Sequence, residues 1–266
     1  MSLTHALNPD KVITTVPGLR HPNQPISEDV SAQWFALKRA ILSGVFSSEN
    51  ITVNDTKLPT SSEAAALLCQ VAKQGWASLG NVELPPLFDM PEETLVRILR
   101  SHVSERFVCR PTWQGRCYET GPFARQLNSA LPRAWVSQYG PGAAARIAAR
   151  FTELLQMINT IDSGLKGASL LRPRAAKPAL GLSQIEAARG RLIHYVELED
   201  ARVVRYRIVA PTEWNFHPDG ILARILNHLP QQGEPRVRRA AELLIKLADP
   251  CVGHQLHLLT REPCHA

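Results

Sequence analysis

The sequence contains no uninterrupted apolar run approaching the ~20 residues that a helix needs to cross a bilayer, which excludes an integral membrane protein. The opening residues lack both an apolar signal core and a twin-arginine pair, so we expect a cytoplasmic protein. The five cysteines are odd in number, and none is arranged as Cys-x-x-Cys. A disulfide framework is therefore not expected, and the cysteine usage fits a reducing compartment.

Motifs of ordinary catalysis are also missing. The sequence has no phosphate-binding GxxxxGK[ST], no dinucleotide-binding GxGxxG after a strand, no HExxH and no GxSxG. The neighbouring carboxylates Glu197, Glu199 and Asp200 fall in an expected hairpin turn, where solvation is a better explanation than acid–base chemistry. No common class of enzyme is indicated.

Aromatic residues make up only 6% of the chain, although the net charge is +6. The densest basic clusters, in 172–177 and 236–239, are not interleaved with aromatic residues that could stack on bases. The excess charge therefore does not indicate nucleic-acid binding. An acidic protein partner accounts for it equally well.

Hydrophobic periodicity predicts a mainly helical protein with a small antiparallel β-sheet, an α+β fold class, in one domain over residues 1–266. Residues 1–26 are polar, rich in proline and without a period, and 164–182 is expected to be a loop. A β-hairpin is expected over 190–209. Helices are expected at about 28–43, 62–74, 91–106, 122–131, 142–162, 219–230 and 235–248.

The segment 249–264 is dense in soft and borderline metal ligands. Cys251, His254, His257 and Cys264 have the spacing C-x2-H-x2-H-x6-C. Thiolate and imidazole both bind zinc and late transition metals, although this spacing is no standard zinc pattern. The alternative is a solvated C-terminal segment.

Four segments resemble motifs of the large subunit of nickel–iron hydrogenases, in the same order along the chain. The segment 249–257, DPCVGHQLH, is similar to D-P-C-x-x-C-x-x-H. Upstream, 184–195 (QIEAARGRLIHY) resembles E-A-P-R-G-x-L-x-H-[WY], and 210–215 (APTEWN) resembles V-P-T-T-W-N. The segment 110–125 resembles one that ends in E-V-G-P-L-A-R. The motif-bearing region is therefore 107–257.

Departures from that family change the expected function. The enzymes hold their metals with four thiolates, two of them from an N-terminal R-x-C-G-x-C motif that is absent here. In the C-terminal motif His254 replaces the bridging cysteine, and Cys251 alone remains, at the position of a terminal nickel ligand. One thiolate cannot both bridge nickel to iron and complete the nickel shell. We therefore expect no nickel, no hydrogen turnover and no enzymatic activity.

A shortened large-subunit relative without its nickel ligands resembles the hydrogenase expression/formation proteins of the HupK/HoxV type. This resemblance implies a trimmed large-subunit fold and a non-catalytic scaffold or chaperone for hydrogenase maturation. The scaffold would transiently hold the iron–dicyanide–carbonyl fragment, Fe(CN)2(CO), and assist its assembly or transfer to the large subunit. The implied partners are a small maturation chaperone and the immature large subunit. Neither nucleic acid nor membrane insertion is expected.

The resemblance also implies two sets of site residues. The residues expected around the diatomic ligands of the iron fragment are Arg189, Pro211, Thr212 and Asn215. The expected metal ligands are Cys251, His254 and His257. Glu119, which matches an acid of the motif, is expected to pair with Arg125.

Two other readings stay open at the level of sequence. The protein is a structural or regulatory partner of the maturation machinery that handles no metal, or it is a globular protein stabilised by zinc on Cys251, His254, His257 and Cys264. Metal analysis and infrared spectroscopy of anaerobically purified protein distinguish the three, because only the iron-handling role predicts bound CO and CN.

Overall fold

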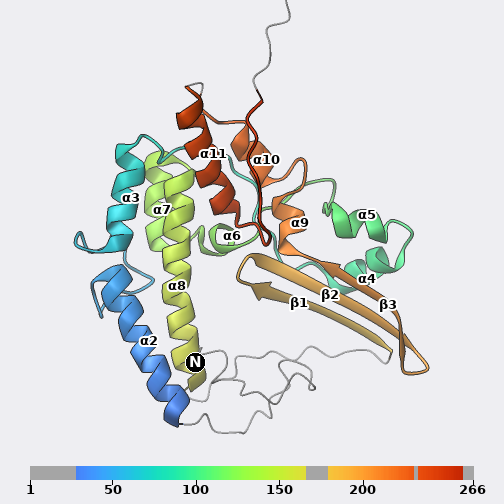
Figure 1. Cartoon of the computed structure of the whole chain (residues 1–266). Coiled ribbons are helices and arrows are strands. Elements are labelled where there is room, and N and C mark those ends of the chain that lie inside the picture. The colour runs from blue at the N-terminus through green and yellow to red at the C-terminus, as the bar shows by residue number, and fades with distance from the viewer. Residues whose placement is uncertain (1–27, 166–178, 231–232, 260–266) are drawn as a thin grey trace, which may run out of the picture.

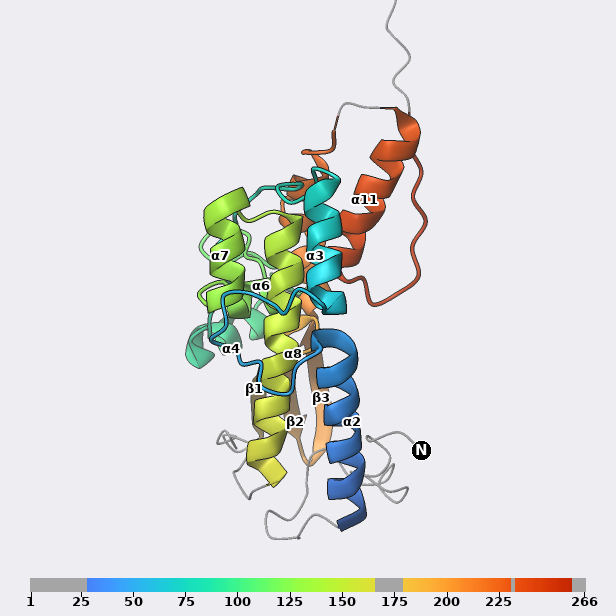
Figure 2. The same ribbon diagram turned by 90° about the vertical axis from the view of Figure 1, so that its left-hand side faces the viewer.

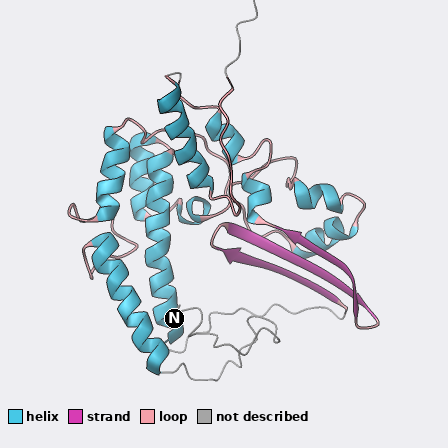
Figure 3. Ribbon diagram, in the orientation of Figure 1, coloured by secondary structure: helices cyan, strands magenta, loops and turns pink. Residues whose placement is uncertain are grey.

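The computed structural model describes residues 28–165, 179–230 and 233–259. These residues form helices on both sides of the longest one, α8, with a three-stranded sheet beside them (Figures 1 and 3). The helices are α2 (Glu28–Phe46), α3 (Glu63–Lys73), α4 (Glu92–Arg100), α5 (Ser104–Cys109), α6 (Pro122–Gln126), α7 (Ala130–Tyr139), α8 (Ala143–Leu165), α9 (Pro211–Asn215), α10 (Ile221–Leu226) and α11 (Glu234–Ala248). In this described part, no helix combines the length and the apolarity needed to cross a membrane.

The alanine-rich first half of α8 is buried in the centre of the molecule. Ala143, Ala144 and Ala148 are fully covered, and their small side chains let neighbouring helices approach closely. The first amides of α8 are satisfied by the preceding chain, since the N–H of Ala143 donates to Leu79 and that of Ala144 to Ala77. Figure 2 shows α3 and α7 beside this half of α8, while α2 runs along its second half. The expected helix over 142–162 is confirmed.

The sheet has the order β1-β2-β3, all antiparallel, with β1 Leu180–Ala187, β2 Gly190–Glu199 and β3 Arg202–Val209. The expected hairpin over 190–209 is confirmed. Asp200 and Ala201 have φ values of 46° and 60° in its two-residue turn, which matches the right-handed twist of the strands. The strand β1 was not expected, because its sequence, LGLSQIEA, lies partly in the predicted loop 164–182 and begins with residues of weak β-propensity.

The inner face of the sheet carries the second part of the core. Ile193, Tyr195 and Val209 are completely buried there, packed with Trp214 of α9 and Leu95 of α4. Burial of such side chains contributes ~1.5–3 kcal/mol each. This packing fixes where the turn between β1 and β2 lies relative to α9, and both segments contribute to the site described below.

Two helix predictions need correction. The expected helix 91–106 is two helices, because the chain turns at 101–103, where Ser101 folds its hydroxyl back onto the carbonyl of Ile98. The expected helix 122–131 stops at Gln126, and a separate helix, α7, follows it. Periodicity misses the break in 91–106 because α4 and α5 pack Leu95, Leu99 and Phe107 into the same apolar cluster.

The predicted fold class, mainly helical with a small antiparallel sheet, is confirmed. The single domain over 1–266 stays a prediction, and its irregular segment 1–26 lies outside the described residues, as does Cys264.

Candidate functional site

The four sequence segments that resemble hydrogenase motifs converge on one cavity. Thr120, Arg189, Asn215 and Asp249, one from each segment, all line it. The remaining lining residues are Glu119, which is next to Thr120 in the chain, and residues of α6, α8, α10 and α11, namely Pro122, Phe123, Arg146, Arg150, Ile221, Ile225, Leu247 and Ala248. Residues up to 130 positions apart in sequence thus form one polar site at the junction of the helices and the sheet.

The segment 119–121 forms one wall of the cavity, and the side chain of Asn215 binds the backbone of this segment. The side chain of Asn215 accepts a hydrogen bond from the N–H of Thr120 at 3.0 Å and donates one to its carbonyl at 2.9 Å. The hydroxyl of Thr120 in turn accepts from the N–H of Arg191 at 2.7 Å. Asn215 is buried and its amide is engaged in these contacts. The structure therefore gives Asn215 the role of positioning the wall.

The turn between β1 and β2 approaches this wall so closely that glycine is required. Gly190 has a φ of +132°, and a Cβ added to it would lie 2.4 Å from the hydroxyl oxygen of Thr120. Gly121 has a φ of +110°, and a Cβ there would lie 2.9 Å from the carbonyl oxygen of Arg189. The two glycines let Arg189 be held against the 119–121 segment.

Behind the wall lies a buried ion pair between Glu119 and Arg146, both less than one-tenth exposed. Arg146 donates from Nε at 3.1 Å and from Nη2 at 2.9 Å to the two carboxylate oxygens. It also donates to the carbonyls of Val82 and Pro141. The expected pairing of Glu119 with Arg125 is therefore wrong, because α8 brings the buried guanidinium of Arg146 to the carboxylate.

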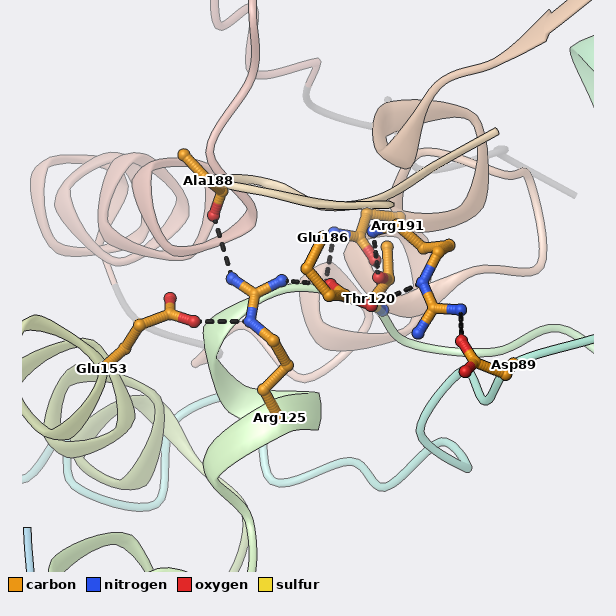
Figure 4. A network of polar contacts seen from close by, with 8 residues as sticks. Asp89, Thr120, Arg125, Glu153, Glu186, Ala188 and Arg191 are labelled. Carbon is orange, nitrogen blue, oxygen red and sulfur yellow. Dashed lines mark hydrogen bonds and ion pairs between the residues drawn. The ribbon is translucent and has the colours of Figure 1, made fainter. Parts of the chain in front are cut away.

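Arg125 belongs instead to a second network, at the outer side of the β1–β2 turn (Figure 4). It pairs with Glu153 of α8 and Glu186 of β1, and its Nη2 donates to the carbonyl of Ala188. Burial disfavours its charge, but the hydrogen bonds and attraction from Glu153 and Glu186 outweigh burial and raise the pKa of Arg125. Glu186 also pairs with Arg191. The network anchors the turn that carries Arg189.

Arg189 itself faces the last turn of α11. Its Nε donates to the carbonyl of Asp249 at 3.1 Å and lies 3.6 Å from an oxygen of the Asp249 carboxylate. Asp249 ends α11 with a φ of 56°, a left-handed helix end. Arg150 adds hydrogen bonds to the carbonyls of Lys246 and Leu247. Two arginines thus fix the end of α11, which leads directly into Pro250 and Cys251.

The two Nη groups of Arg189 have no hydrogen-bond partner among the described residues, and its side chain is 41% exposed. A guanidinium in this state can donate to an anionic or nitrogen acceptor at the cavity mouth. The cavity has a volume of only about 20 Å³. That volume holds about one water molecule, so a larger ligand fits at the mouth rather than inside.

Pro211 and Thr212 do not line the cavity. Pro211 is buried in the first turn of α9, where its fixed φ suits a helix start, and the carbonyl of Thr212 accepts from the N–H of Phe216. Both residues form and position the helix that carries Asn215. Their contact with a bound iron fragment stays a prediction.

The three expected metal ligands are exposed and lie on a segment without regular structure. Cys251, His254 and His257 follow one another at three-residue steps, and an extended chain separates such positions by ~10 Å per step. Among the described residues, no three His, Cys, Asp or Glu side chains lie close enough together to hold a metal ion. The structure therefore does not gather these residues into one site, and their assignment as ligands stays a prediction.

The other described cysteines lie elsewhere, and all are free thiols. Cys117 is buried with its sulfur 3.3 Å from Nδ1 of His217. Burial, with a smaller effect from the carboxylate of Asp219, raises the pKa of the Cys117 thiol. Cys69 and Cys109 are exposed.

Sequence reasoning missed Arg146, Arg150 and Arg191. They lie outside the matched positions of the four motifs, and nothing in the local sequence indicates which carbonyls or carboxylates they reach. Thr120 lies within a matched segment and could have been found there.

Comparisons with known proteins relate the chain to hydrogenase proteins. A family described as nickel-dependent hydrogenase matches residues 126–222. The chain is 35% identical over 210 residues to the hydrogenase expression/formation protein HoxV of Cupriavidus necator, covering 74% of this chain and 52% of that protein. It is 34% identical over 181 residues to HupK of Rhizobium leguminosarum, covering 65% of this chain and 46% of HupK.

The fold is similar to that of the nickel–iron–selenium hydrogenase from Desulfovibrio vulgaris Hildenborough in its as-isolated oxidized state. The TM-score is 0.58 at 16% identity, over 85% of this chain and 61% of that one, a likeness that concerns the fold alone. The chain spans about half the length of the curated relatives it matches. By sequence it is a homologue of the hydrogenase expression/formation proteins of the HupK/HoxV type, and by fold a relative of the hydrogenase large subunit.

Proposed function

We propose that this protein assists the maturation of nickel–iron hydrogenase as a non-catalytic scaffold that transiently holds Fe(CN)2(CO) as its cargo. The observation that carries the proposal is the contact of Arg189 with Asp249, two residues before Cys251. This contact places a guanidinium with free donors next to the segment that bears the motif thiol. The printed names of the relatives, expression/formation proteins, support a role in maturation.

The thiolate of Cys251 is the proposed anchor of the iron, because low-spin iron carrying CO and cyanide favours a soft sulfur donor. Arg189 donates hydrogen bonds from its Nη groups to a cyanide nitrogen at the cavity mouth. Asp249 orients Arg189, and Asn215 holds the opposite wall through Thr120. His254 and His257 are the further donors on the same exposed segment.

A single thiolate anchor suits a transfer function. Release of the cargo exchanges one iron–sulfur bond for another: the bond to Cys251 breaks as a thiolate of the partner binds, and the iron keeps its oxidation state. Because Cys251 is exposed, a partner thiolate can approach it. The proposed partners are the small maturation chaperone and the immature large subunit, and nickel takes no part.

The test compares Cys251→Ala with Cys69→Ala, another exposed cysteine of this chain. Each variant replaces the wild-type gene in a strain that depends on it, and hydrogenase activity is measured in cells. The anaerobically purified proteins are examined by infrared spectroscopy for bound CO and CN. We expect Cys251→Ala to lose the bands and the activity, and Cys69→Ala to keep both.

Arg189→Met, with Cys251 intact, is expected to keep the CO band and to shift the CN bands, since the hydrogen bond to cyanide is lost. Full hydrogenase activity in the Cys251→Ala strain would contradict the proposed function. So would wild-type protein that carries no CO or CN bands after anaerobic purification from active cells.

A further inference from the structure

A second hollow also lies against α11 but shares no lining residue with the candidate site. It is a groove of about 370 Å³ lined by residues of α11 and of the end of α3. The wall on α11 bears Arg236, Arg239 and Lys246, and the wall on α3 bears Gln70 and Gln74. It is many times larger than the space in the candidate site, and neither the motifs nor the proposed function accounts for it.

The wall on α11 is a line of positive charge. Arg236, Arg239 and Lys246 lie on one face of the helix, and the rise of ~1.5 Å per residue spreads them over ~15 Å. Neither Arg239 nor Lys246 has an ion-pair partner in the part of the chain that the structure describes. Glu242 is the one carboxylate among the lining residues, so the groove keeps an excess of positive charge.

One end of the groove is already ordered. Arg236 donates from Nη2 to the carbonyl of Gln74 at 2.9 Å, and its guanidinium lies over the ring of Trp76 at 5.9 Å from the centroid. Within the described part of the chain, Trp76 is the only aromatic residue that lines the groove. Because Arg236 covers its face, the groove offers no free stacking platform for a base. A nucleic acid is therefore a poor fit, in spite of the charge.

The wall on α3 has a different chemistry. The side-chain amides of Gln70 and Gln74 stand one helical turn apart and have no hydrogen-bond partner among the described residues. An amide both donates and accepts, so a pair of them suits the N–H and C=O groups of an extended peptide backbone. Cations on one wall and amides on the other match a strand whose carboxylates all point to one side.

We propose that this groove binds an extended acidic segment of the protein that docks during maturation. An extended peptide advances ~3.3 Å per residue, so four or five residues span the line of cations, and alternate side chains present two or three carboxylates to it. The inference rests on the proposed function for the identity of the partner, and deepens it by assigning the docking surface.

The groove lies close to Cys251 along the chain, which suits a docking surface for the partner that receives the cargo. α11 ends at Ala248, and Lys246 precedes Cys251 by five residues on the same continuous stretch of chain. Arg150 and Arg189 fix the end of that helix. A partner held along α11 therefore lies near the exposed thiol, where ligand exchange requires it.

The direct test uses the purified full chain and a fluorescein-labelled peptide of alternating glutamate and serine, about twelve residues long, followed by fluorescence anisotropy. The groove variant is Arg239→Glu with Lys246→Glu. The matched control is Arg39→Glu with Arg133→Glu, two exposed arginines on α2 and α7 with the same change of net charge. At ~100 mM salt we expect the groove variant to bind at least about tenfold more weakly, and the control to bind within about twofold of wild type.

Equal losses in both double variants would show that binding follows net charge and would overturn the inference. Unchanged binding by the groove variant would overturn it as well, as would tighter binding of a single-stranded oligonucleotide of equal charge. The thermal unfolding of each double variant is measured as well. We expect both double variants to have the melting temperature of wild type, because all four substituted side chains are exposed.

Hydrogenase activity in cells separates the two proposals. We expect the groove variant to lose peptide binding and to lower hydrogenase activity, and Cys251→Ala to lose activity while it still binds the peptide. If Cys251→Ala keeps full activity but the groove variant loses the peptide, the proposed function fails and the groove assignment stands. If the groove variant loses the peptide and keeps full activity, the docking inference fails while the proposed function stands.

Discussion

Replacing Arg146 by methionine tests whether the buried ion pair behind the candidate site holds the fold together. The change removes the guanidinium and leaves the carboxylate of Glu119, whose side chain is 7% exposed, without its partner. Removing one partner of a buried ion pair costs about 3–5 kcal/mol, because a charge stays buried and uncompensated. The carbonyls of Val82 and Pro141 also lose their donor.

The measurement is urea and thermal unfolding followed by circular dichroism. For a chain of this size each kcal/mol lowers the melting temperature by about 2–4 °C, so we expect Arg146→Met to melt roughly 6–20 °C below wild type. The urea midpoint should fall with little change in the slope m. The control is Lys38→Met, since the Lys38–Asp162 pair is partly exposed, at 28% and 21%, and such pairs contribute at most about 1 kcal/mol.

A double variant, Arg146→Met with Glu119→Leu, sharpens the test. Replacing both ions by apolar side chains removes the buried charge, so the double variant should be more stable than Arg146→Met alone. If the free energy of unfolding of Arg146→Met lies within about 1 kcal/mol of the wild-type value, the reasoning is refuted, because the carboxylate of Glu119 must then be solvated by water or paired with another cation.

Two further outcomes follow from single residues. Gly190→Ala should destabilise the protein by about 1–3 kcal/mol, because its φ is +132° and the added Cβ would collide with Thr120. Gly44→Ala in α2, where the added Cβ meets nothing within 4 Å, should instead stabilise the protein by about 0.5–1 kcal/mol. Chemical unfolding measures both variants, and equal effects on stability would contradict the close approach of the β1–β2 turn. Burial raises the pKa of Glu213, so the folded state holds this proton more tightly and loses stability as pH rises above the unfolded pKa of about 4.3. Glu213→Gln should therefore be more stable than wild type at pH 7, with a difference that vanishes below about pH 4, and a variant less stable at pH 7 would contradict it.

Much of the local structure could be predicted from the sequence. The hairpin 190–209 follows from two runs of β-branched and aromatic residues around Asp200 and Ala201, and the helix over 142–162 follows from its alanine-rich apolar face. The break between α4 and α5 and the strand β1 could not, because tertiary packing decided them against the local pattern.

The site was predictable only in part. The order of the four motifs indicated which segments belong together, and the structure brings one residue of each to the same cavity. Asn215 lines the cavity, its amide holds the backbone of Thr120, 95 positions away, and its contact with a ligand stays a prediction. Cys251, His254 and His257 lie exposed on a segment without regular structure, the described residues include no gathered group of three possible metal ligands, and the assignment of these three as ligands stays a prediction.

Residue type, period and motif order within short stretches were enough to predict the fold class, the hairpin and the presence of His254 where the resembled motif has its second cysteine. Only the tertiary structure decided that Glu119 pairs with Arg146, that Arg189 faces Asp249, and that α3 and α11 form a basic groove. Those contacts join elements far apart in the chain, and the free energy that selects them comes from burial and charge pairing across the whole core, which no local pattern records.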